Sequence, residues 1–192
     1  VTGVQTCALP ISTTYNSPIG PFFLASDDIG LIGVWMDGQK YFADSIKTKS
    51  SISKETDILS QTKHWLDIYF SGKNPDFLPP LHPQTSSEFR KAVWKILLTI
   101  PYGHTMTYGE LAKQLAKENG VSKMSAQAVG GAVGHNPISI IVPCHRVVGA
   151  NGSLTGYAGG IDKKIKLLTL EHADMSHLFV PKASFSLQPE PE

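Results

Sequence analysis

The sequence predicts an α+β fold, with an antiparallel β-meander in its first half and packed helices in its second half. Short runs of β-forming residues fill positions 22–42, whereas apolar residues recur every three or four places through positions 89–133. With 192 residues, of which 41% are hydrophobic, the chain can bury one large core or two small ones. No apolar run approaches the ~18 residues of a membrane span, and we expect no signal peptide.

Differences in composition divide the chain into four segments. Residues 1–12 lack periodicity and resemble a translated sequencing adapter, so we expect a non-native segment that takes no part in the fold. Residues 13–84 are expected to form a first domain and residues 85–172 a second domain. Residues 173–192 form a C-terminal tail, for which we expect partial disorder.

The first domain is expected to combine three short strands with one helix. The strands are predicted at residues 22–25, 31–36 and 39–42, and Asp37-Gly38 is a strong signal for a hairpin turn. A helix over residues 58–70, ended by Gly72, would cover the sheet with its apolar face. Residues 74–87 contain four prolines and are interpreted as an interdomain linker. No spacing in this half is typical of catalysis, so we interpret it as a scaffold.

The second domain is expected to hold a helix-turn-helix pair. One helix is predicted over residues 89–100, and a capping box from Thr107 to Glu110 opens the next one. A third helix, over residues 125–133, consists almost wholly of small side chains, which would let it approach another surface closely. Residues 85–172 carry 10 Lys or Arg against 5 Asp or Glu. This excess favours a polyanionic partner, although a solvated basic face is the commoner explanation.

The candidate reactive group is a cysteine that follows an apolar run. Residues 140–142 are interpreted as a short buried strand, and Pro143 restricts the backbone, so Cys144 would be held at a defined angle beside His145. A thiol next to a potential base is what nucleophilic catalysis needs, although a lone cysteine in this setting is more often a core residue. Glu171 ends the last predicted helix, where the macrodipole disfavours its charge, so it is a candidate to hold His145.

Taken together, these motifs resemble the O6-alkylguanine-DNA alkyltransferase family (methylated-DNA–protein-cysteine methyltransferases). The matching segments are residues 129–132, 136–137, 143–147, 156–160 and 170–171. The resemblance extends from Tyr15 to about Glu171, and the Pro-Cys-His-Arg-Val core in this setting is highly specific. It implies a ribonuclease-H-like first domain and a winged-helix-like second domain that binds DNA and accepts the alkyl group. The expected partner is double-stranded DNA that contains O6-alkylguanine.

The resemblance implies a role for each matching residue. Cys144 would accept the alkyl group from guanine O6 (and from O4-alkylthymine), His145 would act as its base through a water molecule, and Glu171 would orient the imidazole. Tyr108 would donate a hydrogen bond to the leaving base, and Asn136 would brace the active-site loop. The residues expected to contact DNA or the base are Ser125, Ala126, Gln127, Arg146, Val147, Tyr157 and Ala158. The third helix would enter the minor groove while the damaged nucleotide rotates into the pocket.

Further expectations follow from the same resemblance. Each molecule would act once, as a monomer, and no metal or organic cofactor is expected. Gln127 stands where the family usually has an arginine that fills the gap left by the extruded base, so weaker base flipping or DNA binding is expected. No Cys and His set suits the structural zinc of some relatives. The two cysteines, Cys7 and Cys144, do not make a disulfide framework, which favours a reducing cytoplasm.

Two alternative functions stay open on the sequence. The chain could be a non-catalytic sensor of alkyl lesions on the same fold, although members of that kind lack the thiol that Cys144 supplies. It could instead be a Cys-His hydrolase of peptide or ester bonds, in which the helix of small residues only packs.

Overall fold

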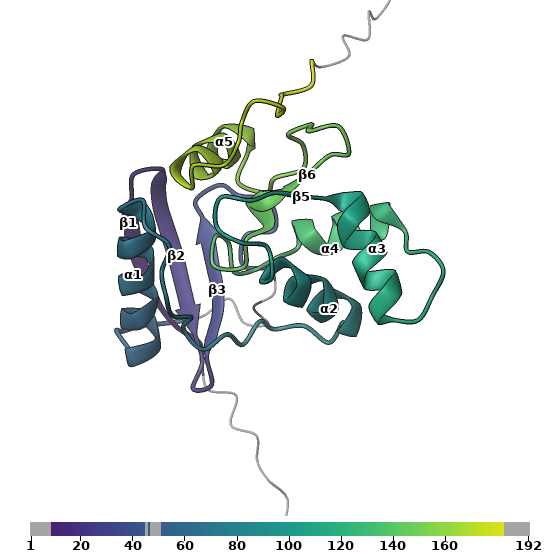
Figure 1. Ribbon diagram of the computed structural model, residues 1–192. Helices are drawn as coiled ribbons and strands as arrows, with labels where there is room; N and C mark the ends of the chain where they lie inside the picture. Colours follow the sequence, from purple (N-terminus) through teal and green to yellow (C-terminus); the bar gives the residue numbers. More distant parts are fainter. Residues whose placement is uncertain (1–8, 45, 47–50, 183–192) are drawn as a thin grey trace, which may run out of the picture.

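A four-stranded sheet forms the first half of the computed structural model, which describes residues 9–44, 46 and 51–182 (Figure 1). β1 (Ile11–Ser17), β2 (Gly20–Ser26) and β3 (Leu31–Met36) are antiparallel neighbours, and the short β4 (Ile52–Ser53) pairs in parallel with β1. The strand order is therefore β3-β2-β1-β4. The predicted antiparallel meander is confirmed, but the strands that form it are not all those predicted.

One helix covers this sheet. α1 (Asp57–Phe70) is capped by Thr56, whose hydroxyl accepts a hydrogen bond from the Leu59 amide, and the chain turns away at Gly72, where φ is +84°. Its buried face consists of Leu59, Thr62, Trp65, Leu66 and Tyr69. Figure 1 shows α1 alongside β1 and β2, with α2, α3 and α4 of the second half gathered beyond β3 and α5 at the top of the view. The predicted helix and its apolar face are confirmed.

Three predictions about the first half need correction. Residues 39–42 form turns instead of a strand, and the Lys40 amide donates to the Ala158 carbonyl oxygen at 3.0 Å, so this segment bonds to the second half of the chain. Ile11 and Ser12 belong to β1 and pair with β2, so the expectation that residues 1–12 take no part in the fold is wrong for these two. The presumed linker runs beside β3, because the Leu31 amide donates to Pro80 and the His82 amide donates to Leu31.

The second half is helical, as predicted. Its helices are α2 (Glu88–Leu97), α3 (Tyr108–Glu118), α4 (Ala126–Gly134) and α5 (Ile161–Leu170). The capping box from Thr107 to Glu110 is present in both of its hydrogen bonds and opens α3. Two short parallel strands, β5 (Met106–Thr107) and β6 (Val147–Val148), join the start of α3 to the segment after Cys144. α3 and α4 form the expected helix pair, while α2 ends three residues before the predicted boundary.

A single hydrophobic cluster spans both halves of the molecule. It includes Leu24, Leu66, Leu97 and Leu111 together with the residues just before Cys144. The backbone of Val34 in β3 also contacts the second half: its amide donates to Pro137, and its carbonyl oxygen accepts from the Ser139 amide. The segment that carries Cys144 is therefore held directly against the sheet.

Outside the described part of the chain lie the first eight residues of the suspected non-native segment, which include Cys7, and residues 183–192 of the tail. Among the described residues, every helix is too short or too polar to span a bilayer.

Candidate active site

Cys144 lies at the start of a single 3-10 turn, η1 (Cys144–Arg146), and its side chain is only 7% exposed. The prediction of a buried strand before it is wrong. Residues 140–142 are buried, but they form tight turns in which the Ile141 amide bonds to Ser139 and the Val142 amide bonds to Ile138. Ile140 has φ of +71°, a left-handed conformation that no regular strand contains. The turns set the position of the sulfur relative to the core.

Asn136 connects these turns to the sulfur. Its side-chain nitrogen lies 2.7 Å from the Val142 carbonyl oxygen and 3.2 Å from the Cys144 sulfur, and its side-chain oxygen accepts from the Ile138 amide at 3.0 Å. Asn136 is buried and directly follows the C-cap residue of α4. One side chain therefore fixes the loop and donates a hydrogen bond to the thiol group.

Glu171 is the centre of a buried hydrogen-bond network. One carboxylate oxygen, Oε1, lies 2.6 Å from His145 Nε2 and accepts from the Tyr69 hydroxyl at 2.7 Å. The other, Oε2, accepts from Arg146 Nε at 2.8 Å and from the Gly103 amide at 3.1 Å. A second Arg146 nitrogen reaches Oε1 at 3.0 Å. The network joins α1, η1, the start of the loop before β5 and the end of α5.

These contacts decide which nitrogen of His145 carries the proton. Burial alone would raise the pKa of Glu171, but hydrogen bonds and charge from His145 and Arg146 outweigh it and hold that pKa far below its ordinary value. Glu171 is therefore an acceptor only, so Nε2 of His145 carries hydrogen and Nδ1 has the free lone pair. Burial lowers the pKa of His145, against the opposing pull of Glu171. Nδ1 is buried and has no hydrogen-bond partner among the described residues.

The surroundings of the sulfur have opposing effects on the pKa of Cys144. Burial raises the pKa of Cys144, while the hydrogen bond from Asn136 and the charge of Lys164 lower it. Lys164, in α5, is fully buried, and its ammonium donates to the Val147 carbonyl at 2.6 Å and to the Thr155 carbonyl at 3.0 Å. Burial lowers the pKa of Lys164 to about 8. The thiol is thus protonated at rest, but a positive charge is present to stabilise its anion.

Lys164 was missed by the sequence analysis, although a signal existed. It lies four residues before Leu168 and three before Leu167, both of which are buried, so it shares the apolar face of α5. A lysine on such a face is seldom buried without a specific partner.

Two tyrosines, one of them in a glycine-rich loop, lie close enough to Cys144 to interact with it electrostatically. Tyr108 is the first residue of α3, and its pKa is raised to about 12 by burial and by repulsion from the Cys144 sulfur when that group is ionised. A side chain at Gly156 would lie 3.0 Å from the Tyr108 hydroxyl, and φ there is +70°, so glycine is required for this approach. The Tyr157 hydroxyl is buried and has no partner in the part of the chain that the structure describes, although the residue as a whole is only partly buried.

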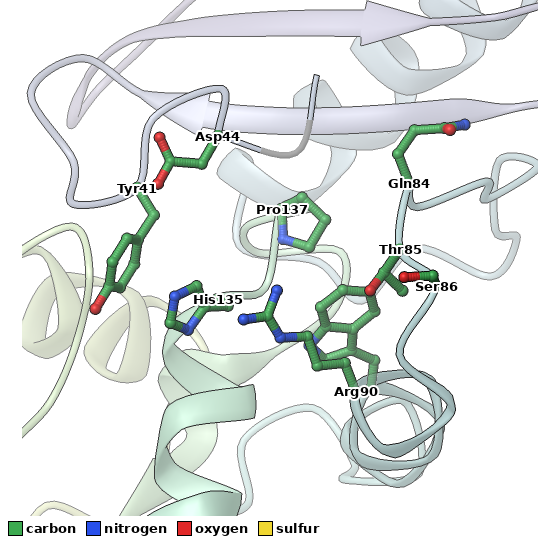
Figure 2. A pocket seen from close by; sticks show the side chains of 9 residues that line it. Tyr41, Asp44, Gln84, Thr85, Ser86, Arg90, His135 and Pro137 are labelled. Carbon is green, nitrogen blue, oxygen red and sulfur yellow. The ribbon is translucent and has the colours of Figure 1, made fainter. Parts of the chain in front are cut away.

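A cavity of about 220 Å³ lies next to this loop. Its wall consists of Lys40, Tyr41, Gly130, Gly131, Gly134, His135, Gly156, Tyr157 and Ala158. A larger cavity, of about 430 Å³, lies on the other side of Tyr41 and His135 and is lined by Arg90, Trp94 and the segment around Gln84 (Figure 2). The Tyr41 and His135 rings stack with centroids 3.9 Å apart and form a wall common to both cavities. The first half of the chain thereby contributes to the smaller cavity.

The structure places the other predicted site residues in two groups. Arg146 belongs to the Glu171 network, and Val147 donates its amide to the Cys144 carbonyl while its own carbonyl accepts from Lys164. Ser125, Ala126 and Gln127 lie apart from the sulfur, exposed at the beginning of α4. Ser125 caps that helix by accepting from the Ala128 amide. The start of α4 therefore offers an open surface, and its opposite face is buried.

No group of three or more metal-ligating side chains occurs within residues 9–44, 46 and 51–182.

Comparisons with known proteins agree with this geometry. A family model described as the ribonuclease-like domain of 6-O-methylguanine DNA methyltransferase matches residues 11–83, and one described as its DNA binding domain matches residues 88–173. The methylated-DNA–protein-cysteine methyltransferase of Methanosarcina acetivorans is 45% identical over 158 residues, which cover 82% of this chain and 95% of that protein. Its counterpart from Mycobacterium tuberculosis is 44% identical over 158 residues, covering 82% and 90%.

Solved structures show the same relationship. A crystal structure of Mycobacterium tuberculosis OGT in complex with DNA superposes with a TM-score of 0.71 at 41% identity, covering 88% of this chain and 94% of that one. An O6-methylguanine DNA methyltransferase from Methanococcus jannaschii superposes with a TM-score of 0.59 at 28% identity, covering 88% and 99%. Both halves of the chain are matched, in sequence and in fold. The chain therefore belongs to the 6-O-methylguanine DNA methyltransferase family.

Proposed function

We propose that this protein repairs DNA by direct transfer of an alkyl group from O6-alkylguanine to the sulfur of Cys144. The observation that carries the proposal is the arrangement of the buried Cys144 thiol, held by Asn136, directly before a histidine whose proton is fixed by Glu171. Family membership supplies the substrate class, because the relatives are named methylated-DNA–protein-cysteine methyltransferases. O4-alkylthymine is a second substrate within the same proposal.

The reaction is a displacement at saturated carbon. The Cys144 sulfur attacks the carbon attached to guanine O6, an S–C bond forms, and the C–O6 bond breaks with its electron pair passing to the purine. The thiol proton moves through a water molecule to Nδ1 of His145, which has the free lone pair. Glu171 stabilises the imidazolium that forms, as the carboxylate of a hydrolase triad does. The product is a thioether, so each molecule acts once.

The leaving purine gathers negative charge as the C–O6 bond breaks. Tyr108 keeps its proton at neutral pH, because its pKa is raised to about 12, and its hydroxyl lies beside the glycine-rich loop. It is therefore available to donate a hydrogen bond to the departing base. The cavity of about 220 Å³ between α4 and this loop is the proposed place of the everted base, with Ala158 in its wall. The Val147 backbone remains a proposed second contact with the base.

The exposed start of α4 is the proposed contact with the DNA minor groove. Ser125, Ala126 and Gln127 are small or neutral, which suits close approach to a narrow groove, and Gln127 would occupy the gap left by the everted base. Arg146 contributes by holding Glu171 in place inside the protein, because it donates to Glu171 and to the Ile100 carbonyl and is only slightly exposed. We place the protein in the cytoplasm, as a monomer, where reducing conditions keep the thiol free.

A repair assay tests this proposal. The protein is mixed with a duplex that contains a single O6-methylguanine, and loss of the lesion is followed at several ratios of DNA to protein. We expect repair to stop at one lesion per protein molecule and Cys144→Ser to repair none. Repair of many lesions by one molecule, or repair by the serine variant, would contradict transfer to this cysteine.

A further inference from the structure

Tyr69 brings the first half of the chain into the active site. It lies near the end of α1 and is completely buried, with its ring stacked on Trp65 and its edge toward Tyr102. The spacing of residues in this half gives no indication of a role in catalysis. Its hydroxyl nevertheless reaches Glu171, 102 positions later in the chain, at 2.7 Å.

The hydroxyl shares a single oxygen atom with the active-site histidine. Oε1 of Glu171 accepts hydrogen bonds from both the Tyr69 hydroxyl and Nε2 of His145, and these two donors lie 3.5 Å apart. Burial raises the pKa of Tyr69 well above 10, so the phenol remains a donor at all pH values at which the protein works. Because Nε2 of His145 also carries hydrogen, it does not accept a hydrogen bond from the Tyr69 hydroxyl. The two groups are both donors, and they compete for Oε1 of Glu171.

We propose that Tyr69 is a positioning residue for alkyl transfer, which fixes the Glu171 oxygen that binds His145 and weakens that oxygen's hold on the imidazolium. Arg146 and the Gly103 amide anchor mainly the other oxygen, so Tyr69 is the group that, with the second Arg146 nitrogen, defines where Oε1 points. The inference rests on the proposed function, because the rate it modifies is the rate of that reaction.

The physical consequence concerns the proton affinity of His145. A hydrogen bond from a phenol withdraws negative charge from the accepting oxygen, and without it the carboxylate stabilises the imidazolium more strongly. The other groups facing His145 are Arg146, Lys164 and Cys144, and all three stay in place when only the phenolic oxygen is removed. Losing that oxygen should therefore raise the pKa of His145, so that less neutral base is present on the acid side of the rate profile.

The test compares Tyr69→Phe with the wild type and with a matched control. Tyr15→Phe removes another tyrosine hydroxyl that bonds a carboxylate, that of Asp67 on the same helix, at an exposed position away from the site. Single-turnover rates with O6-methylguanine duplex are measured from about pH 5 to about pH 9. We expect the acid limb of the Tyr69→Phe profile to shift to higher pH by about half to one unit. At a given pH on that limb, the rate would then be about 3- to 10-fold lower than in wild type. The rate at high pH and the whole Tyr15→Phe profile should stay within about twofold of wild type.

Two further measurements separate this inference from the proposed function and from folding. NMR titration of the His145 imidazole needs no substrate and should show the same upward shift in Tyr69→Phe. Incorporation of 3-fluorotyrosine at position 69 keeps the ring and strengthens the donor, so the acid limb should move in the opposite direction. Superposed titrations, or a loss of rate that is equal at every pH, would overturn the inference. A wild-type protein that transfers no alkyl group would overturn the proposed function, while the NMR titration would still decide the role of Tyr69.

Discussion

Replacing Glu171 with glutamine is the most informative single change in this protein. The carboxylate is fully buried and joins His145, Arg146, Tyr69 and the Gly103 amide. The amide keeps the shape but leaves Arg146 with a buried positive charge and no counter-charge. Breaking a buried ion pair in this way costs about 3–5 kcal/mol. In a chain of this size that corresponds to a fall in Tm of roughly 6–20 °C.

The same substitution should slow alkyl transfer, because the imidazolium that forms on His145 loses its stabilising charge. We expect a decrease of at least about 100-fold in the single-turnover rate. Glu88→Gln is the matched control, since Glu88 is 84% exposed and pairs with Lys91 on the surface. That variant should lose less than about 1 kcal/mol and keep its rate. Thermal unfolding and transfer rates are measured on both. Equal changes in the two variants would refute the reasoning that the buried carboxylate holds the site together.

Three other changes test separate parts of the account. Asn136→Ala removes a donor from the Cys144 sulfur, so the pKa of Cys144 should rise and its reaction with a small alkylating reagent should shift to higher pH; an unchanged profile would contradict the contact. Lys164→Met tests the buried ammonium: the pKa of Lys164 is about 8 when folded and 10.5 ordinarily, so the unfolded chain binds more protons between these values and wild-type stability should rise with pH there. Chemical denaturation at both ends of this range should show the rise in wild type and not in the variant. Gln127→Arg should tighten binding to methylated duplex and steepen its salt dependence by about 0.9 in the log–log slope, and anisotropy titrations that show a weaker or unchanged complex would contradict a contact between α4 and DNA.

Local signals in the sequence predicted the elements that depend on near neighbours. The Thr107–Glu110 capping box opens α3, and Gly72 ends the turn after α1, because the atoms involved lie within a few residues of each other. Residues 39–42 show the limit of such signals. They include β-forming side chains, but a strand needs a partner, and the Lys40 amide bonds to Ala158 in the second half instead.

The apolar run before Cys144 was wrongly predicted for a related reason. Short buried runs fit strands, helices and turns equally well, and the left-handed backbone at Ile140 depends on how Asn136 and the sheet hold the segment. None of the predicted strands covers β1, and its first two residues, Ile11 and Ser12, adjoin a stretch without periodicity.

The candidate site divides in the same way. Cys144, His145, Asn136 and Glu171 were found through motifs, and the structure joins Asn136 to the Cys144 sulfur and His145 to Glu171. Tyr69 and Lys164 belong to no motif. The Tyr69 hydroxyl contacts its partner only after the two halves pack together, and the Lys164 ammonium finds its carbonyl partners only when α5 packs against the segment after Cys144. Contacts between segments that are distant in the chain leave no local sequence pattern, so they could not be predicted from the sequence.

In the proposed reaction the sulfur of Cys144 takes the alkyl group itself. Its most direct test is the intact mass of the protein after incubation with methylated duplex, followed by fragmentation to locate any added group. We predict the gain of a single methyl group in place of one hydrogen, located on Cys144 and absent from Cys144→Ser. Binding without a change in mass would identify a lesion sensor, and neither binding nor a mass change would favour a hydrolase; either result would contradict the account.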